Sequence, residues 1–351
     1  MRIFFRIFDF IIHNKQSKMR NSLFLIGLAL TLFSCGSQKE IAKNQNLSKP
    51  VEIKPTNPPK PDIKHDVHGD YFTVNIADPS KNDNTISYGS LVGAKPEGYK
   101  VTRKNFPAVA QNFRQKYVIL HYTALDHDKS VRVLTTQAVS SHYLVNDSAD
   151  VEIYQLVDEN KRAYHAGISS WRKDITLNDT SIGIEIVNDG YKVVAGKKVF
   201  APFPEYQVKK VAALVKDIVD RYQIPATNIL AHSDIAPTRK QDPGPEFPWK
   251  KLYDDYGLGM WYDEAVKQNF MSQIIPEEFN AKINDAAFVM KVQIALKQFG
   301  YNLTETGTWD DVTKKTIEAF QYHFRPQKYD GKMDAETWAI LQALNQKYPN
   351  K

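Results

Sequence analysis

The sequence predicts an α/β fold, with a mixed central β-sheet flanked by helices and followed by a small three-helix bundle. Two observations carry this expectation. Short runs of β-branched and aromatic residues alternate along the chain with segments whose apolar residues recur at helical spacing. Beyond residue 284, only the helical spacing continues. Mixed strands and helices are typical of an α/β domain, and a run of short amphipathic helices is typical of a bundle.

The expected strands lie in the middle of the chain. They are Tyr117–Tyr122, Ser141–Val145, Val151–Leu156, Ser181–Val187 and Asn228–His232. Before the last of them, apolar residues recur at helical spacing over residues 208–222. This helix is expected to end before Pro225, because the residue that precedes a proline disfavours helical geometry.

The expected bundle covers residues 284–346. Apolar residues fall on one helical face in each of three segments, residues 289–299, 312–320 and 338–344. The third segment is preceded by Asp334, a residue type that caps helix N-termini well. The three faces can bury one another, so we expect a compact three-helix unit.

The chain of 351 residues carries a net charge of +6, and the whole excess lies near its N-terminus. Residues 1–66 hold 11 basic and 5 acidic side chains, whereas the remainder holds 35 of each. A neutral remainder argues against a surface built to bind nucleic acid, and we expect no nucleic-acid partner.

The N-terminal segment has the layout of an export signal. Lys15, Lys18 and Arg20 precede an apolar run over residues 23–33, which is shorter than the roughly 20 residues of a membrane-spanning helix. The one cysteine, Cys35, follows this run. A single cysteine excludes an intramolecular disulfide and a thiolate metal cluster.

The residues around Cys35 resemble a bacterial lipobox, with Leu three positions earlier and a small residue on either side. The resemblance implies a signal peptide over residues 1–34, a lipid on Cys35 and a location in the cell envelope. Residues 35–66 are polar and rich in proline, and we expect them to form a disordered tether to the membrane. Gly36 and Ser37 stand where an Asp would retain some lipoproteins at the inner membrane, which favours the outer membrane.

Two histidines stand at the C-terminal ends of predicted strands, His121 and His232, where α/β sheets commonly place their sites. Two imidazoles and one carboxylate with an open fourth position form a catalytic zinc site. The spacing leaves two candidates for the carboxylate. Asp234 would give the two-His-one-carboxylate site of non-haem iron enzymes, whereas Asp242 requires the chain to loop back.

Five segments resemble, in the same order, the zinc-dependent N-acetylmuramoyl-L-alanine amidase family, whose fold is shared with peptidoglycan recognition proteins. They are Val118–Thr123, Ser140–Val145, Ala163–Gly167, Asn178–Glu185 and His232–Pro245. The resemblance spans roughly residues 110–250, and we expect the catalytic domain to cover residues 67–262. It implies one Zn²⁺ held by His121, His232 and Asp242, and so decides against Asp234.

The resemblance also implies roles for further residues. Glu185 matches the catalytic glutamate, which would take a proton from water and pass it to the leaving amine. Its Ile and Val neighbours would raise its pKa through burial. Lys240 matches the catalytic lysine, which would stabilise the oxyanion. His165 is a candidate for substrate binding or for a structural hydrogen bond, and Arg239 for binding a substrate carboxylate or for a plain surface position.

The C-terminal segment, residues 284–346, resembles the three-helix peptidoglycan-binding domain found in wall hydrolases. Together the resemblances imply a lipid-anchored amidase that hydrolyses the bond between N-acetylmuramic acid and L-alanine in peptidoglycan or muropeptides. The alternative is a non-catalytic peptidoglycan receptor on the same fold. That alternative predicts a broken metal triad or a missing Glu or Lys, and all five residues are present.

Overall fold

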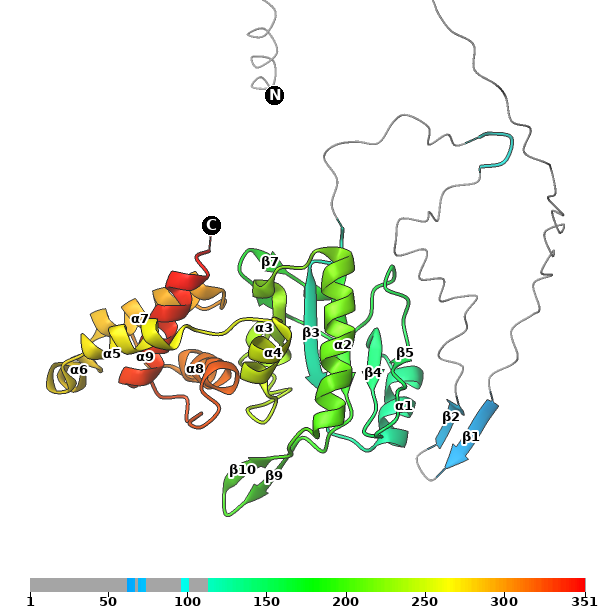
Figure 1. Ribbon diagram of the computed structural model, residues 1–351, viewed down its shortest axis with the longest axis horizontal. Helices are drawn as coiled ribbons and strands as arrows, with labels where there is room; N and C mark the ends of the chain where they lie inside the picture. Colours follow the sequence, from blue (N-terminus) through cyan, green and yellow to red (C-terminus); the bar gives the residue numbers. More distant parts are fainter. Residues whose placement is uncertain (1–61, 67–68, 74–95, 101–112, 351) are drawn as a thin grey trace, which may run out of the picture. The chain divides into compact units, whose positions relative to one another are not determined.

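The computed structural model describes residues 62–66, 69–73, 96–100 and 113–350 (Figure 1). The expected signal peptide, Cys35 and most of the expected tether lie outside the described residues. Within the described part, no helix combines the length and the apolar character that crossing a membrane requires.

A short antiparallel hairpin spans the boundary between the expected tether and the expected catalytic domain. Its strands are β1 (Asp62–Asp66) and β2 (Gly69–Thr73), with Asp66 opposite Gly69. Regular pairing therefore begins inside the segment expected to be without structure. The residues of β2 include aromatic and β-branched types, which favour extended backbone. The prediction of a disordered tether was based on the proline-rich composition of the residues before them.

A five-stranded mixed sheet lies at the centre of the fold and confirms the predicted fold class. In spatial order its strands are β11 (Ile229–Ala231), β3 (Tyr117–Tyr122), β8 (Ser181–Ile186), β4 (Tyr143–Val145) and β5 (Tyr154–Gln155). The first four run parallel, and β5 is antiparallel to β4. The carboxyl ends of β11, β3 and β8 therefore meet at one edge, where His121 stands in register with Glu185.

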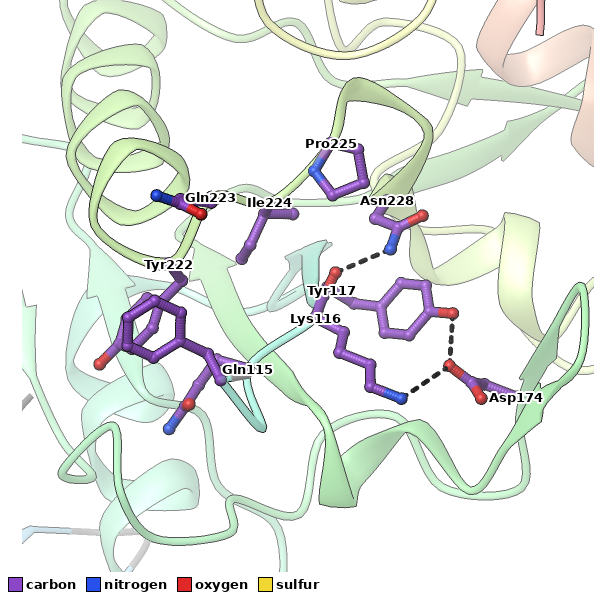
Figure 2. Close-up of a pocket in the computed structure, with 10 residues that line it drawn as sticks. Gln115, Lys116, Tyr117, Asp174, Tyr222, Gln223, Ile224, Pro225 and Asn228 are labelled. Atoms are coloured by element: carbon purple, nitrogen blue, oxygen red, sulfur yellow. Dashed lines mark hydrogen bonds and ion pairs between the residues drawn. The ribbon is translucent and has the colours of Figure 1, made fainter. Parts of the chain in front are cut away.

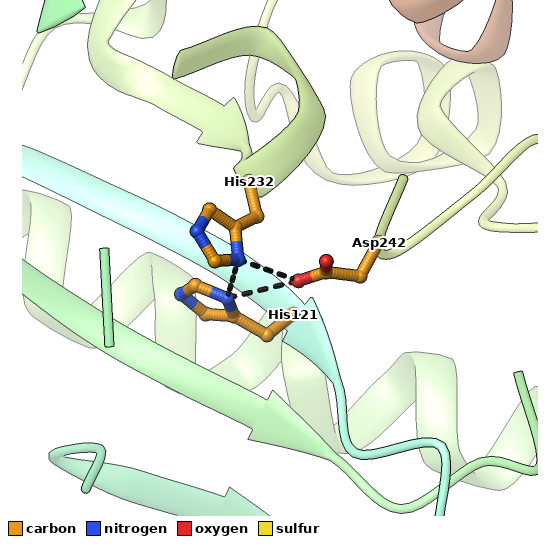
Figure 3. A group of neighbouring side chains, drawn as sticks. All are labelled: His121, His232 and Asp242. Carbon is orange, nitrogen blue, oxygen red and sulfur yellow. Dashed lines mark hydrogen bonds and ion pairs between the residues drawn. The ribbon is translucent and has the colours of Figure 1, made fainter. Parts of the chain in front are cut away.

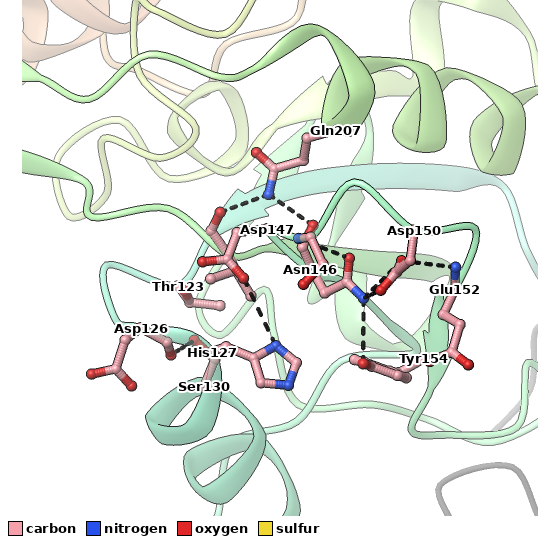
Figure 4. Close-up of polar contacts among 12 residues, drawn as sticks. Thr123, Asp126, His127, Ser130, Asn146, Asp147, Asp150, Glu152, Tyr154 and Gln207 are labelled. Carbon is pink, nitrogen blue, oxygen red and sulfur yellow. Dashed lines mark hydrogen bonds and ion pairs between the residues drawn. The ribbon is translucent and has the colours of Figure 1, made fainter.

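Strand β4 begins at Tyr143, two residues later than predicted, and β5 begins three residues later than predicted because side chains hold the loop before it. The Asn146 amide donates to Asp150 and to the Tyr154 hydroxyl, and the Gln207 amide donates to the Asn146 carbonyl (Figure 4). The buried ammonium of Lys210 donates to the Asn146 side chain at 2.6 Å. These bonds replace ladder pairing over residues 146–152.

Helix α2 (Glu205–Tyr222) lies against the sheet (Figure 1). Its apolar face, which includes Val211, Val215 and Ile218, is buried. The helix ends at Tyr222, before Ile224 and Pro225, as predicted. The other elements here are α1 (His127–Thr136), α3 (His232–Ile235), α4 (Trp249–Tyr256), the 3₁₀ turns Leu177–Asp179 and Ala226–Asn228, and the hairpin strands β6 (Ser170–Trp171), β7 (Asp174–Ile175), β9 (Tyr191–Val194) and β10 (Lys197–Phe200).

The C-terminal helices are α7 (Ala286–Phe299), α8 (Asp311–Phe324) and α9 (Ala335–Lys347), at the three predicted places. They and their connections, residues 284–348, are called the C-terminal bundle below. Helices α5 (Glu264–Ser272) and α6 (Pro276–Lys282) precede it, and α5 packs against α9. The bundle has no separate core, because its buried residues share one apolar core with the sheet and α4.

Candidate metal centre

Three buried side chains from three segments converge at the carboxyl edge of the sheet (Figure 3). His121 is the next-to-last residue of β3, His232 is the first residue of α3, and Asp242 lies in the loop after α3. The two Nδ1 atoms are 2.9 Å apart, and Asp242 Oδ2 lies 3.0 Å from that of His121 and 2.9 Å from that of His232. The structure therefore brings together the three residues that the sequence suggested as zinc ligands.

A hydrogen bond on the far side of the ring fixes the tautomer of His232. Its Nε2 lies 3.1 Å from the backbone carbonyl oxygen of Ala166. A carbonyl oxygen only accepts, so Nε2 carries the proton and Nδ1 presents a lone pair to the centre.

A longer chain of bonds fixes the tautomer of His121. The Ser181 hydroxyl donates to the Leu177 carbonyl at 2.5 Å, so its oxygen accepts from Nε2 of His165 at 3.1 Å. His165 Nδ1 then accepts from His121 Nε2 at 3.0 Å. His121 Nδ1 is left with a lone pair that also faces the centre.

This arrangement fits a divalent cation. Two nitrogen lone pairs and a carboxylate face one another at hydrogen-bond distance with no proton assigned between them. Burial and the neighbouring His232 lower the pKa of His121 to about 4, which keeps its imidazole neutral. Burial alone would raise the pKa of Asp242, but the two imidazoles hold it well below its usual value. Neutral imidazoles and an ionised carboxylate are the states in which these groups bind zinc.

Glu185 lies beside this centre on the neighbouring strand. Its Cα is paired with that of His121, so both side chains leave the same face of the sheet. Its Oε2 is buried and has no hydrogen-bond partner in the described part of the chain. Burial and the charge of Asp242 raise the pKa of Glu185 to about 8, and Lys240 opposes this shift. Such a carboxyl can both accept and return a proton near neutral pH.

A cavity of about 250 Å³ opens over these groups. Glu185, His232, Lys240 and Asp242 are among its lining residues. The lining also includes apolar residues of α1 and its flanking segments, Leu125, Val133, Leu134 and Val139. The cavity can therefore hold a small apolar group against the polar centre.

His165 and Arg239 lie next to the Nε2 atoms of the two histidines, which point away from the metal centre. His165 lines the cavity, yet both of its ring nitrogens are engaged, by His121 and Ser181. Arg239 Nη2 donates to the carbonyls of Ala166 at 2.6 Å and Ile168 at 3.0 Å. These contacts favour the structural alternative for His165. They also give Arg239 Nη2 two backbone partners, and a contact of Arg239 with a substrate carboxylate stays a prediction.

The alternative iron site, built on Asp234, is wrong. A strand that continued through His232 would place the side chains of His232 and Asp234 on one face. The chain instead turns into α3 at His232, because the Asp234 carboxylate accepts a hydrogen bond from the Ala231 N–H at 2.8 Å. Asp234 then faces the C-terminal bundle, where Tyr301 and His323 donate to it.

Sequence reasoning missed the residues that orient the ligands. The Asn178 side chain accepts from the backbone N–H groups of His165 and Ala166, at 3.1 and 2.7 Å, and Ser181 completes the chain to His121. Both lie in a segment that resembles the family, and polar residues beside a 3₁₀ turn were the available signal. No sequence signal connected Tyr301 or His323 with this site.

A second cavity, of about 400 Å³, lies at the opposite, amino ends of β3 and β11 (Figure 2). Its polar groups pair with one another: Tyr117 donates to Asp174 at 2.7 Å, and Asn228 donates to the Lys116 carbonyl at 2.9 Å. Paired groups of this kind stabilise a fold and offer little to a substrate, so the chemistry is assigned to the other edge.

Known proteins resemble this chain over the same region. Residues 111–245 match the family model described as N-acetylmuramoyl-L-alanine amidase, and residues 285–341 match that of a putative peptidoglycan binding domain. The N-acetylmuramoyl-L-alanine amidase AmiD of Escherichia coli is 43% identical over 258 residues, which cover 72% of this chain and 90% of that protein.

Solved structures give the same result. The complex of E. coli AmiD with the substrate anhydro-N-acetylmuramic acid-L-Ala-D-gamma-Glu-L-Lys superposes with a TM-score of 0.64 at 42% identity, covering 72% of this chain and 97% of that one. AmpDh3 of Pseudomonas aeruginosa, in complex with anhydromuramic pentapeptide, superposes with a TM-score of 0.61 at 39% identity, covering 74% of this chain and 100% of that one.

Proposed function

The chain belongs to the N-acetylmuramoyl-L-alanine amidase family, and we propose that it performs its reaction with one Zn²⁺ held by His121, His232 and Asp242. Zinc in a three-ligand site supplies a Lewis acid that activates water near neutral pH. The observation that carries the proposal is the orientation of both imidazoles, whose Nδ1 lone pairs face Asp242 Oδ2 at 3.0 and 2.9 Å.

The residues of the cavity suit the two proton transfers of amide hydrolysis. Glu185, with its raised pKa and unpartnered oxygen, takes the proton of the attacking water and returns it to the leaving amine of L-alanine. Lys240 lines the same cavity and supplies positive charge for the oxygen of the scissile carbonyl. The apolar residues of the lining offer contacts to the lactyl and alanine methyl groups.

Purified full-length protein tests this proposal. We expect about one zinc per chain by metal analysis and release of free peptide from a muropeptide, detected by mass spectrometry. Glu185→Ala should keep the zinc and lose the release. A zinc-loaded parent that releases no peptide would contradict the proposal, and full activity in Glu185→Ala would contradict the assigned role.

The substrate is a peptidoglycan fragment or peptidoglycan itself. The AmiD structure contains an anhydro-muropeptide and that of AmpDh3 an anhydromuramic pentapeptide. We propose that this chain accepts the same class of compound in its 250 Å³ cavity. The match of residues 285–341 to a peptidoglycan-binding family supports a further contact with the wall through the C-terminal bundle.

We also propose that the protein is exported and lipid-anchored through Cys35 in the cell envelope, at the outer membrane. The short apolar run over residues 23–33, the basic residues before it and the position of the one cysteine support this. Labelling with a fatty-acid analogue tests it, with Cys35→Ala as the control. Labelled parent and unlabelled variant are expected, and an unlabelled parent would refute the anchor.

A further inference from the structure

The short helix α3 holds two of the three groups of the metal centre. Its first residue is His232, and the backbone N–H of Ser233 donates to the backbone carbonyl of Asp242 at 3.0 Å. A displacement of α3 would therefore move His232 and Asp242 away from His121. A helix of four residues has little stability of its own, so other contacts must fix its place.

The carboxylate of Asp234 supplies those contacts. Asp234 is also on α3 and is 1% exposed. It accepts from the Ala231 N–H at 2.8 Å, from the Tyr301 hydroxyl at 2.8 Å and from His323 Nδ1 at 2.7 Å. A buried carboxylate without such partners is costly, so each of these bonds constrains α3. Two of the three come from the C-terminal bundle.

The two donors are themselves held firmly. The ring of His323 stacks on Trp249 with ring centroids 3.9 Å apart, and its side chain is fully buried. The ring of Tyr301 packs against Trp171 at 5.2 Å, and the carbonyl of Gly300 accepts from the Arg172 N–H at 2.8 Å. The packing of Tyr301 and His323 therefore fixes the position of α3 relative to the bundle.

We propose that Tyr301 and His323 are positioning residues of the metal centre, which they align through Asp234 and α3. This rests on the proposed zinc site at His121, His232 and Asp242. The bundle then serves catalysis even on small soluble substrates that need no anchoring to the wall. A module that only binds the wall would affect insoluble substrate alone.

The test compares single and double variants of the full chain, Tyr301→Phe and His323→Leu, with the parent. Chelator competition measures the zinc dissociation constant, and a soluble anhydromuramoyl tripeptide gives kcat and KM. Loss of outer partners typically costs 10–100-fold in metal affinity or activity, so we expect the double variant to release zinc about 10–100-fold more readily. Its kcat should fall with KM unchanged.

Two further variants separate a specific effect on the metal centre from a general weakening of the packing around the bundle. Tyr348→Phe removes two other hydrogen bonds of the bundle, those of its hydroxyl with the Trp261 carbonyl at 3.2 Å and the Trp261 N–H at 3.4 Å, and should leave zinc affinity and kcat unchanged. His323→Asn keeps a donor close to the place of Nδ1 and should restore most of the affinity that His323→Leu loses. The visible spectrum of the Co²⁺-loaded protein should change in His323→Leu and recover in His323→Asn.

A double variant with parental zinc affinity and kcat would overturn the proposal, and so would an equal loss in Tyr348→Phe. If His323→Leu does not fold, Tyr301→Phe alone decides, because it keeps the ring and its packing. The proposed function fails separately: a zinc-loaded parent without amidase activity would refute it, while the zinc affinities would still test the positioning.

Discussion

Two glutamates of the same domain have opposite surroundings. Glu159 accepts four hydrogen bonds, two from Arg221 at 2.6 and 2.7 Å and one each from the hydroxyls of Tyr143 and Tyr222 at 2.5 Å. Burial alone would raise its pKa, but these donors lower it. Glu185 has an unpartnered buried oxygen, and its pKa is raised to about 8.

The difference shows how one fold uses the same side chain for stability and for chemistry. A carboxylate surrounded by donors stays ionised and fixes the elements that supply the donors. A carboxyl left without partners stores an unfavourable interaction, which suits a group that must exchange protons during a reaction. Substitutions at the two positions should therefore separate activity from stability.

The largest expected effect is on activity, from Glu185→Gln. Removing a general acid–base group typically costs 10²–10⁴-fold in rate, and we expect kcat to fall by about that factor. The unfolding free energy should stay equal or rise, because an unpartnered acid is replaced by a neutral amide. Steady-state kinetics and chemical denaturation measure both quantities. A variant that is mainly unstable would contradict the assignment.

The opposite result is expected for Glu159→Gln. This substitution removes the negative charge that pairs with the Arg221 guanidinium. Removing one partner of a buried ion pair typically costs about 3–5 kcal/mol. The unfolding free energy should fall by about this amount, with kcat per folded molecule unchanged. Loss of kcat at parental stability would show that the comparison is wrong.

A smaller effect is expected from Gly183→Ala, which would disturb the hydrogen bond between His165 and His121. A Cβ at this position would lie 2.4 Å from the ring of His165, so that ring must move and its bond to His121 must weaken. We expect zinc affinity to fall by about 10–100-fold. Chelator competition measures it, and an unchanged affinity would remove His165 from the orienting chain.

The smallest effect is the pH dependence of the metal-free protein. Folded Glu185 keeps its proton up to pH about 8, whereas unfolded chains release it near 4.5, so Glu185 should make stability fall as pH rises between these values. Glu159, with its lowered pKa, should make stability fall as pH drops below 4.5. The melting temperature of Glu185→Gln minus that of the parent should therefore increase from pH 5 to pH 8. A constant difference would contradict the assignment of the pKa shift.

The fold class and the chemistry were predictable because they rest on local patterns. The strand runs, the helical spacing over residues 208–222 and the segments around His121 and His232 are all visible in short windows. The turn into α3 was not, because it depends on Asp234 capping the helix and on donors from Tyr301 and His323. These donors lie 67 and 89 residues further along the chain.

The orienting network was also hidden from sequence. Ser181 and Asn178 lie next to residues with clear signals, but their partners are backbone carbonyls and N–H groups brought together by the sheet. The same holds for Glu159, whose partner Arg221 lies on α2, 62 residues away. Spacing along the chain carries no information about pairs of this kind.

Hydrolysis of a muropeptide in water labelled with ¹⁸O tests the central claim most directly. The zinc-loaded protein should place one ¹⁸O in the lactyl carboxylate of N-acetylmuramic acid and release peptide with a free L-alanine amine and no label. Label in a peptide carboxylate would show that another bond is cleaved. An absence of released peptide would contradict the assignment of Glu185 and the metal centre to this reaction.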